Sequence, residues 1–117
     1  MLFKIIPMKI MLLFLLTTFI PGFNFAQNIY SVDIIHNSLN TSLRGLSVVD
    51  NNIIWVSGSN GYVGKSIDGG FTFEFNQIHP YYSAEFRDIE AFDENTAVVM
   101  SSVQPACILK TVDGGKI

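Results

Sequence analysis

The sequence has few of the residues on which disulfides and metal sites depend. It contains one cysteine, Cys107, in 117 residues, and one thiol can neither form an internal disulfide nor supply a metal cluster. Its immediate neighbours are apolar, so we expect a buried and unreactive thiol. The two histidines, His36 and His79, have no partner at the spacing of a metal site. We therefore predict no bound metal.

Charged residues are also scarce, at 15% of the chain, and acids outnumber bases by ten to seven. The basic residues are dispersed, so the chain lacks the basic stripe with which nucleic-acid-binding proteins neutralise phosphates. Apolar residues make up 49% of the chain, which argues against disorder. These proportions predict a small folded domain that binds no nucleic acid.

Residues 1–26 have the features of an export signal. Lys4 and Lys9 precede an uninterrupted apolar run over residues 10–20, which ends at a Pro-Gly pair and is followed by the small residue Ala26. This order is typical of a secretory signal peptide. The run has about half of the roughly 20 residues that a membrane-spanning helix needs. We therefore predict a signal peptide over residues 1–26, only transient contact with the membrane through it, and a secreted or periplasmic bacterial protein.

The remaining sequence contains two copies of one repeat. Residues 43–52 align with residues 86–95 at an offset of 43, and residues 65–70 align with residues 110–115 at an offset of 45. The second copy therefore carries two extra residues, most simply within residues 103–106. A period of about 44 residues is the length of a four-stranded β-propeller blade.

The first copy divides into four predicted strands, each bounded by turn residues. The second strand, over residues 53–57, is apolar without alternation, as expected of a strand covered on both faces. The last alternates phenylalanine with polar residues and so places three phenylalanines on one face. An N-terminal strand is predicted over residues 29–35. The four strands of the first copy are predicted over residues 43–49, 53–57, 62–66 and 71–75.

The predicted fold class is all-β: a partial β-propeller of about two four-stranded blades after an N-terminal signal peptide. Residues 27–42 form an N-terminal strand or linker in this prediction, and residues 43–117 form the two blades, of which the second is truncated.

The segment from Ser66 to Phe73 fits the pattern S/T-x-D-x-G-x-T-aromatic at every constrained position. An aspartate carboxylate can accept N–H groups within its own turn, and paired glycines supply positive φ without a steric penalty. We expect Phe71 or Phe73 to anchor the turn on the blade core. The second copy begins the same motif and stops at Ile117. The predicted structural residues are Ser66, Asp68, Gly69, Gly70, Thr72 and Phe73 in the first copy and Thr111, Asp113, Gly114 and Gly115 in the second.

This motif resembles the Asp-box, or bacterial neuraminidase, repeat of sialidase-like propellers. The intervening segments, Gly45–Val49 and Trp55–Gly61, are most similar to the photosystem II stability/assembly factor type of repeat, which has exported bacterial relatives. The resemblance covers residues 43–117. It implies a β-propeller whose Asp boxes are structural hairpin turns on the periphery, away from the channel face.

Arg44 and Arg87 occupy the same position in the first strand of the two copies. Strict alternation places each arginine on the face of the apolar residues that follow it two and four positions later. On the innermost strand of a blade, such arginines could line the channel mouth and bind anions. The alternative is that they bond to carbonyl groups at the blade edge or to neighbouring acids.

The sequence contains no recognisable catalytic constellation. Residues 59–66 come within one residue of a phosphate-binding loop, but Asp68-Gly69-Gly70 follows and prevents the helix that such a loop requires. We therefore predict no cofactor. The favoured function is a non-enzymatic exported scaffold that binds a protein or a glycan. Two alternatives stay open: a sialidase-like glycoside hydrolase whose catalytic residues lie in missing C-terminal blades, and a relative labelled oxidoreductase that lacks a recognisable cofactor site.

Overall fold

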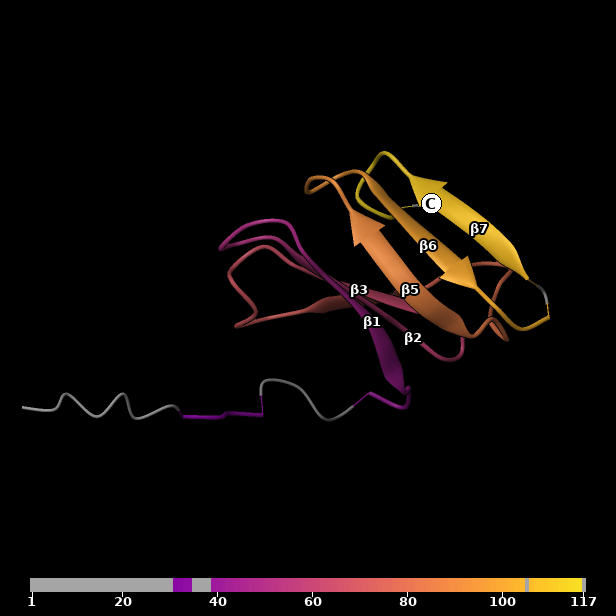
Figure 1. Ribbon diagram of the computed structural model, residues 1–117, viewed down its shortest axis with the longest axis horizontal. Helices are drawn as coiled ribbons and strands as arrows, with labels where there is room; N and C mark the ends of the chain where they lie inside the picture. The colour runs from indigo at the N-terminus through magenta and orange to yellow at the C-terminus, as the bar shows by residue number, and fades with distance from the viewer. Residues whose placement is uncertain (1–30, 35–38, 105, 117) are drawn as a thin grey trace, which may run out of the picture. The chain divides into compact units, whose positions relative to one another are not determined.

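The computed structural model describes residues 31–34, 39–104 and 106–116, and these residues confirm the predicted all-β fold. Seven strands form two antiparallel sheets within one compact unit, residues 33–117 (Figure 1). Sheet 1 has the order β1-β2-β3-β4, and sheet 2 has the order β5-β6-β7. The strands are β1 (Leu43–Val48), β2 (Ile54–Gly58), β3 (Tyr62–Ser66), β4 (Glu74–Gln77), β5 (Phe86–Ala91), β6 (Ala97–Ser101) and β7 (Cys107–Thr111).

None of the described residues forms a helix long and apolar enough to cross a membrane. The predicted signal peptide, residues 1–26, lies outside the described residues. Of the predicted N-terminal strand, residues 31–34 are described and are not in a strand, and the others lie outside the described part of the chain.

The repeat predicted from the sequence is visible in the connections. Three residues, 59–61, join β2 to β3, whereas five residues, 102–106, join the equivalent strands β6 and β7. The two extra residues of the second copy therefore lie in this loop, as predicted. Each copy also begins its first strand with a β-bulge, at Arg44 in β1 and at Arg87 in β5.

The last strand of sheet 1 begins later than predicted, at Glu74 rather than at Phe71. The reason is that the backbone N–H of Thr72 donates to the Asp68 carboxylate at 2.9 Å, which extends the turn through residue 72. Phe71 is 85% exposed, so the expectation that it could anchor the turn is wrong. Phe73 stacks on Phe75 instead, with 5.9 Å between the ring centroids.

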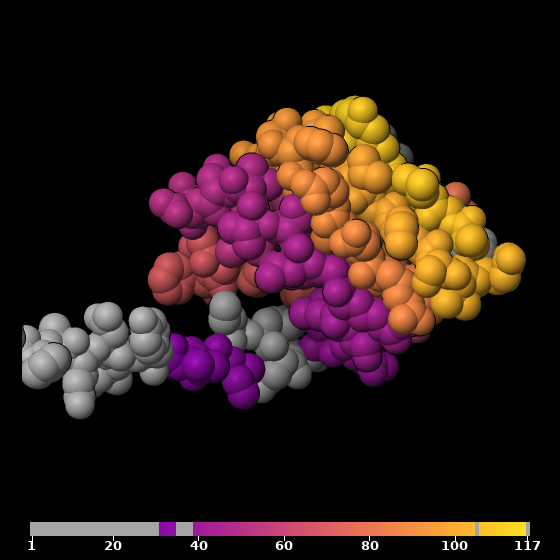
Figure 2. All heavy atoms as spheres, viewed as in Figure 1, coloured from indigo at the N-terminus to yellow at the C-terminus, as the bar shows by residue number. Residues whose placement is uncertain are grey.

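The two sheets pack face to face around Trp55, which is 1% exposed. The core around it draws on both sheets and includes Val63, Phe86, Ile89 and Val99. The surfaces of the two sheets meet in the space-filling view (Figure 2).

The first strands, β1 and β5, lie close together at Gly45. A Cβ atom there would lie 3.0 Å from the backbone nitrogen of Ile89 and 3.1 Å from the carbonyl carbon of Asp88, so a side chain would push the strands apart. Beside it, the backbone N–H of Ala91 donates to Ser47 Oγ at 3.0 Å. These contacts join the two repeats through their first strands.

Repeat-equivalent residues differ in burial because only one of them has a neighbouring sheet to cover it. Ile89 of β5 faces sheet 1 and is 2% exposed, whereas its equivalent in β1, Leu46, is 66% exposed. Leu43 and Val48 lie on β1 with Leu46 and are exposed as well. Sheet 1 therefore has an apolar face that no described residue covers.

Candidate functional site

The two arginines singled out from the sequence are the extra residues of the two bulges. The register of β1 on β2 shifts between Leu43 and Gly45, and that of β5 on β6 shifts between Phe86 and Asp88. A bulge bends the strand and changes the direction of the side chains beside it. The bulges thus set the positions of Arg44 and Arg87 on neighbouring strands.

Strict alternation does not continue across the bulge in β5, so the predicted facing of Arg87 is wrong, whereas Arg44 is exposed as Leu46 and Val48 are. In β5, Arg87 and Asp88 are both exposed, although they are consecutive, while Phe86 and Ile89 on either side are buried. The residue inserted by the bulge breaks the period of two on which the prediction depended. Arg87 consequently does not share the buried face of Ile89.

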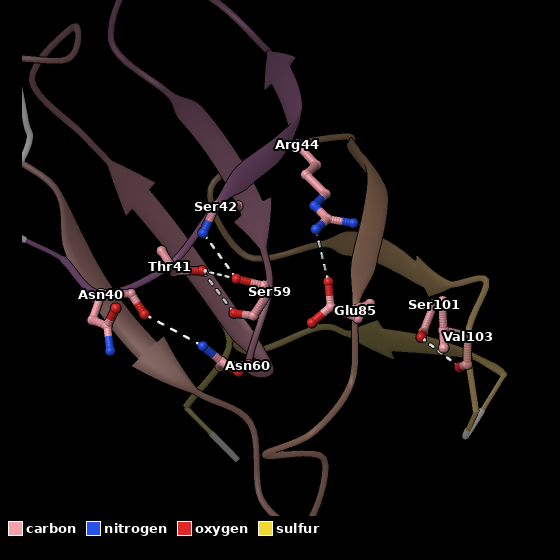
Figure 3. A network of polar contacts seen from close by, with 9 residues as sticks. All are labelled: Asn40, Thr41, Ser42, Arg44, Ser59, Asn60, Glu85, Ser101 and Val103. Carbon is pink, nitrogen blue, oxygen red and sulfur yellow. Dashed lines mark hydrogen bonds and ion pairs between the residues drawn. The ribbon is translucent and has the colours of Figure 1, made fainter.

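Arg44 and Arg87 differ in their partners. Arg44 Nη2 lies 3.0 Å from Glu85 Oε2, and both side chains are partly exposed (Figure 3). Arg44 therefore follows the alternative prediction, in which the arginine bonds to a neighbouring acid. Arg87 is exposed and makes no hydrogen bond or ion pair with any described residue. All the donors of its guanidinium group are therefore available for a ligand, whereas Arg44 already directs one of its nitrogens to Glu85.

The segment before β1 is held by the turn between β2 and β3. Thr41 Oγ1 donates to the carbonyl of Ser59 at 2.7 Å, and the backbone N–H of Ser42 donates to Ser59 Oγ at 2.8 Å (Figure 3). Asn60 Nδ2 reaches the carbonyl of Asn40 at 3.4 Å. These bonds fix the chain just ahead of the bulge and so position Arg44.

The Asp boxes lie at the opposite end of the sheets from the arginines. In sheet 1, Leu43 pairs with Gly58 at one end, whereas Val48 pairs with Ile54, and Ile54 with Ser66, at the other. The first Asp box starts at Ser66, so the length of the sheet separates it from Arg44. We refer to the end that carries Arg44, Glu85 and Arg87 as the arginine end.

In the first Asp box, one carboxylate and one hydroxyl hold the turn together. Asp68 Oδ1 accepts from the backbone N–H of Thr72 at 2.9 Å, and Asp68 Oδ2 accepts from the Thr72 hydroxyl at 2.5 Å. Ser66 Oγ donates to Asp68 at 2.8 Å and accepts from the backbone N–H of Gly70 at 2.8 Å. Gly69 and Gly70 have φ values of 75° and 93°, a region that favours glycine.

The second Asp box repeats this arrangement. Thr111 Oγ1 donates to Asp113 at 2.7 Å and accepts from the backbone N–H of Gly115 at 2.9 Å, and Gly114 and Gly115 have φ values of 77° and 76°. The backbone N–H of Lys116 donates to Asp113 at 3.2 Å. In both boxes the hydroxyl of the first residue and the aspartate carboxylate thus bond within the turn, which is the arrangement expected of a structural motif.

The bonds to Thr72, followed by that from Ser66, lower the pKa of Asp68 from 3.8 to about 2. The bond from the Thr111 hydroxyl likewise lowers the pKa of Asp113. Asp50 and Asp93, in the turns after β1 and β5, also have lowered pKa values, because each accepts two backbone N–H groups. These four carboxylates are therefore kept ionised, which suits hydrogen-bond acceptors rather than general acids.

Sequence reasoning did not single out the residues that join the two sheets by polar contacts. The indole N–H of Trp55 donates to the carbonyl of Asp93 at 3.2 Å. Lys65 Nζ lies 5.2 Å from the centre of the Trp55 ring and donates to the carbonyl of Glu94 at 3.2 Å. The lysine repeated at positions 65 and 110 was a signal in the sequence, but the carbonyl to which Lys65 donates belongs to Glu94 of the second repeat.

Among the described residues, two of the hollows lie between the sheets. One, of about 60 Å³, has a mostly apolar lining that includes Trp55, Val99 and Leu109. The other is an open depression of about 630 Å³ between the turns after β1 and β5. Asp50 and Asp93 line it, and Oδ1 of each carboxylate already accepts two backbone N–H groups. The described residues contain no group of three or more histidine, cysteine or acidic side chains that could hold a metal ion.

No protein-family model and no curated protein matches the sequence. Among solved structures, the chain is similar to "YCF48 bound to D1 peptide", with a TM-score of 0.59 and 23% identity over 69% of this chain and 26% of that one. It is also similar to "YCF48 from Cyanidioschyzon merolae", with a TM-score of 0.55 and 26% identity over 70% of this chain and 27% of that one.

These similarities show that the two sheets are blades of a β-propeller. They also support the predicted likeness to photosystem II assembly factors. The chain spans about a quarter of the length of the two structures that it matches. The finer resemblance to sialidase-like proteins stays a prediction.

Two serines allow the Asp-box network to be tested by the same substitution at two buried positions. Ser66 is 1% exposed and bonded to Gly70 and Asp68, whereas Ser57 is 0% exposed and its hydroxyl has no partner among the described residues. We expect Ser66→Ala to lower the free energy of unfolding by about 1–3 kcal/mol, because it leaves a buried N–H unsatisfied. Ser57→Ala removes an unpaired hydroxyl, so it should leave the free energy of unfolding unchanged or raise it. Urea denaturation measures the stability of both variants. Equal losses of stability would show that the Ser66 hydroxyl does not hold the turn.

The lowered pKa of Asp68 predicts a pH dependence of stability. Folding favours the ionised form, so this stabilisation is present above the ordinary pKa of 3.8 and is lost as the pH falls towards about 2. In Asp68→Asn the decline in melting temperature over this range should be shallower than in the wild type, because the substituted side chain does not titrate. Thermal denaturation monitored by circular dichroism from pH 5 to pH 2 measures the difference. Parallel curves for the two proteins would show that Asp68 has no such role.

Proposed function

We propose that this chain is part of a non-enzymatic β-propeller module that binds a segment of another protein at the arginine end. The fold supports this, because one of the similar YCF48 structures is described as bound to a D1 peptide. The observation that carries the proposal is the repeated bulge, which places an arginine at the start of both β1 and β5. A binding surface assembled from equivalent positions of neighbouring blades suits a module made of repeats.

The chemistry at the arginine end favours a peptide with a carboxylate over a polyanion. Arg87 has unused donors, and a guanidinium group binds a carboxylate through two parallel hydrogen bonds. Glu85 neutralises Arg44, and Asp88 and Glu90 are exposed on the same strand as Arg87. These acids would repel a ligand with many negative charges. The surface therefore suits a protein segment of mixed charge that places one carboxylate at Arg87.

Arg87→Glu tests this proposal. Peptides would be selected on the full chain from a random display library, and the affinity of those that contain a carboxylate would be measured by calorimetry. We expect Arg87→Glu to weaken their binding about tenfold or more, because a charge-assisted hydrogen-bond pair becomes a repulsion. Lys116→Glu makes the same change in charge at the Asp-box end of the sheet and should have little effect.

Equal binding by the wild type and Arg87→Glu would refute the assignment of Arg87. Hydrolysis of a sialoside or an aryl glycoside by the same preparation would contradict a non-enzymatic role and favour the glycoside hydrolase alternative.

We further propose that the protein is exported to the periplasm or the cell exterior of a bacterium. The basic start, the apolar run and the small residue Ala26 support this. Expressed in a bacterial host, the protein should lose residues 1–26 and begin at Gln27. N-terminal sequencing of the product from the periplasm or medium measures this, and an intact N-terminus on a cytoplasmic product would exclude export.

A further inference from the structure

The loop over residues 78–85 joins β4 of the first repeat to β5 of the second and is held by backbone hydrogen bonds. The N–H of Ile78 donates to the carbonyl of Gly61 at 2.8 Å, and the N–H of Gly61 donates to the carbonyl of Ala84 at 2.8 Å. Within the loop, the N–H of Tyr81 donates to Ile78 at 2.7 Å, and that of Ala84 donates to Tyr81 at 2.9 Å. These bonds tie the loop to the turn between β2 and β3, so it lies at the arginine end of the sheets.

Close packing holds the same loop in one conformation. Ala84 is 0% exposed, and Tyr81 packs against the core. Gly61 has a φ of 69°, and a Cβ atom there would collide with the carbonyl oxygen of Tyr81 and lie 3.3 Å from Cα of Tyr82. The loop therefore presents its exposed side chains from a fixed frame, and a surface that is already ordered loses less entropy when it binds a ligand.

Two exposed aromatic side chains, His79 and Tyr82, lie together on this loop, and we refer to them as the aromatic pair. Their ring centroids are 5.5 Å apart, and the rings meet edge to face at 74°. In this geometry His79 covers at most one face of the Tyr82 ring, and Tyr82 is 50% exposed. Neither the His79 ring nor the Tyr82 hydroxyl has a hydrogen-bond partner among the described residues. Both groups are therefore available as donors to a ligand.

The surroundings of the aromatic pair carry no charged side chain. Residues 75–84 contain no aspartate, glutamate, lysine or arginine, and neither do residues 57–64, which include the turn bonded to the loop. Tyrosine, serine, asparagine and glycine are frequent in these two stretches. The same residue types make up the binding loops of antibodies, where tyrosine supplies a rigid contact area and the small polar residues supply adaptable hydrogen bonds. The surface therefore suits an uncharged stretch of a protein segment.

Proline is the residue whose chemistry best matches the aromatic pair. A segment around proline favours the polyproline II conformation, which has no internal hydrogen bonds and leaves its carbonyl groups free to accept. Such segments bind to surfaces lined by aromatic side chains. Tyr82 offers an open ring face to the flat apolar proline ring. Its hydroxyl and the His79 ring N–H can donate to the carbonyl groups on either side.

We propose that the aromatic pair is the proline-binding part of the arginine end. This inference rests on the proposed function, because it takes the contacts at Tyr82 and Arg87 to belong to one bound protein segment. Five positions separate Tyr82 from Arg87 in the sequence, so their Cα atoms are at most about 18 Å apart. A polyproline II segment rises about 3.1 Å per residue, so about six residues reach from the proline to the carboxylate.

A comparison of selected peptides tests this inference. A random display library would be selected separately on the full chain as wild type, Tyr82→Ala, Arg87→Glu and Phe71→Ala. Phe71→Ala is the matched control, because it removes an aromatic ring that is 85% exposed at the Asp-box end. The wild type and Phe71→Ala should enrich proline about threefold or more within about six positions of an acidic residue, whereas Tyr82→Ala should not enrich proline.

The variants separate this inference from the proposed role of Arg87. Arg87→Glu should lose the preference for acidic residues and keep the preference for proline. If Tyr82→Ala enriches proline as strongly as the wild type does, the aromatic pair does not bind proline, although the role of Arg87 stands. Peptides that depend on Tyr82 and contain proline but no acidic residue would refute the role of Arg87 alone. A wild type that enriches no peptide would refute both.

A double-mutant cycle locates the contact. The probe is the peptide most enriched by the wild type, compared with the same peptide in which alanine replaces the proline. Calorimetry should show that Tyr82→Ala weakens binding of the proline peptide by about two- to tenfold and does not weaken binding of the alanine peptide further. Tyr82→Phe keeps the ring and should lose less affinity than Tyr82→Ala, and circular dichroism checks that each variant is folded. Additive losses from the two substitutions would show that the proline lies elsewhere.

Discussion

Trp55 lies between the two sheets, 1% exposed, and its indole N–H donates to the carbonyl of Asp93 on the second repeat at 3.2 Å. This contact combines burial of a large aromatic side chain with the satisfaction of its polar atom, which a buried tryptophan requires. Lys65 covers the ring and bonds to the neighbouring carbonyl of Glu94. The stacking of one blade on the next thus determines which face of each strand is core and which is surface.

The Asp boxes are held by a different kind of interaction. The bonds of their serine, threonine and aspartate side chains connect residues at most four positions apart, as from Thr72 to Asp68 and from Gly115 to Thr111. Such turns form from local hydrogen bonds and from glycines with positive φ, whatever lies on the neighbouring sheet. This locality explains why the two boxes have the same geometry although the sheets around them differ in burial.

The arginine end and the edge of β7 are consequences of the same repeat. Equivalent bulges bring Arg44 and Arg87 to neighbouring strands, but Glu85 pairs with Arg44 alone. Equivalent third strands, β3 and β7, differ because only β3 has a described strand on its outer side. Equivalent positions of the two repeats thus have different neighbours, both for the arginines and for the third strands. The candidate binding site at Arg87 therefore lies where the two repeats are not equivalent.

The sequence alone determined the repeat, the location of its extra residues and the limits of the first three strands to within one residue, because these depend on local periodicity and turn residues. It could not determine the start of β4, since the side chain of Asp68 extends the turn beyond the point at which alternation begins.

Only the tertiary structure decided the burial of each face and the partners of the arginines. Leu46 and Ile89 are equally apolar in the sequence, yet one is exposed and the other buried, because only Ile89 has a sheet packed against it. Arg44 and Arg87 stand in equivalent positions, yet only Arg44 meets an acid. Local patterns specify strands and turns within a blade, whereas contacts between blades join residues that are far apart in the sequence.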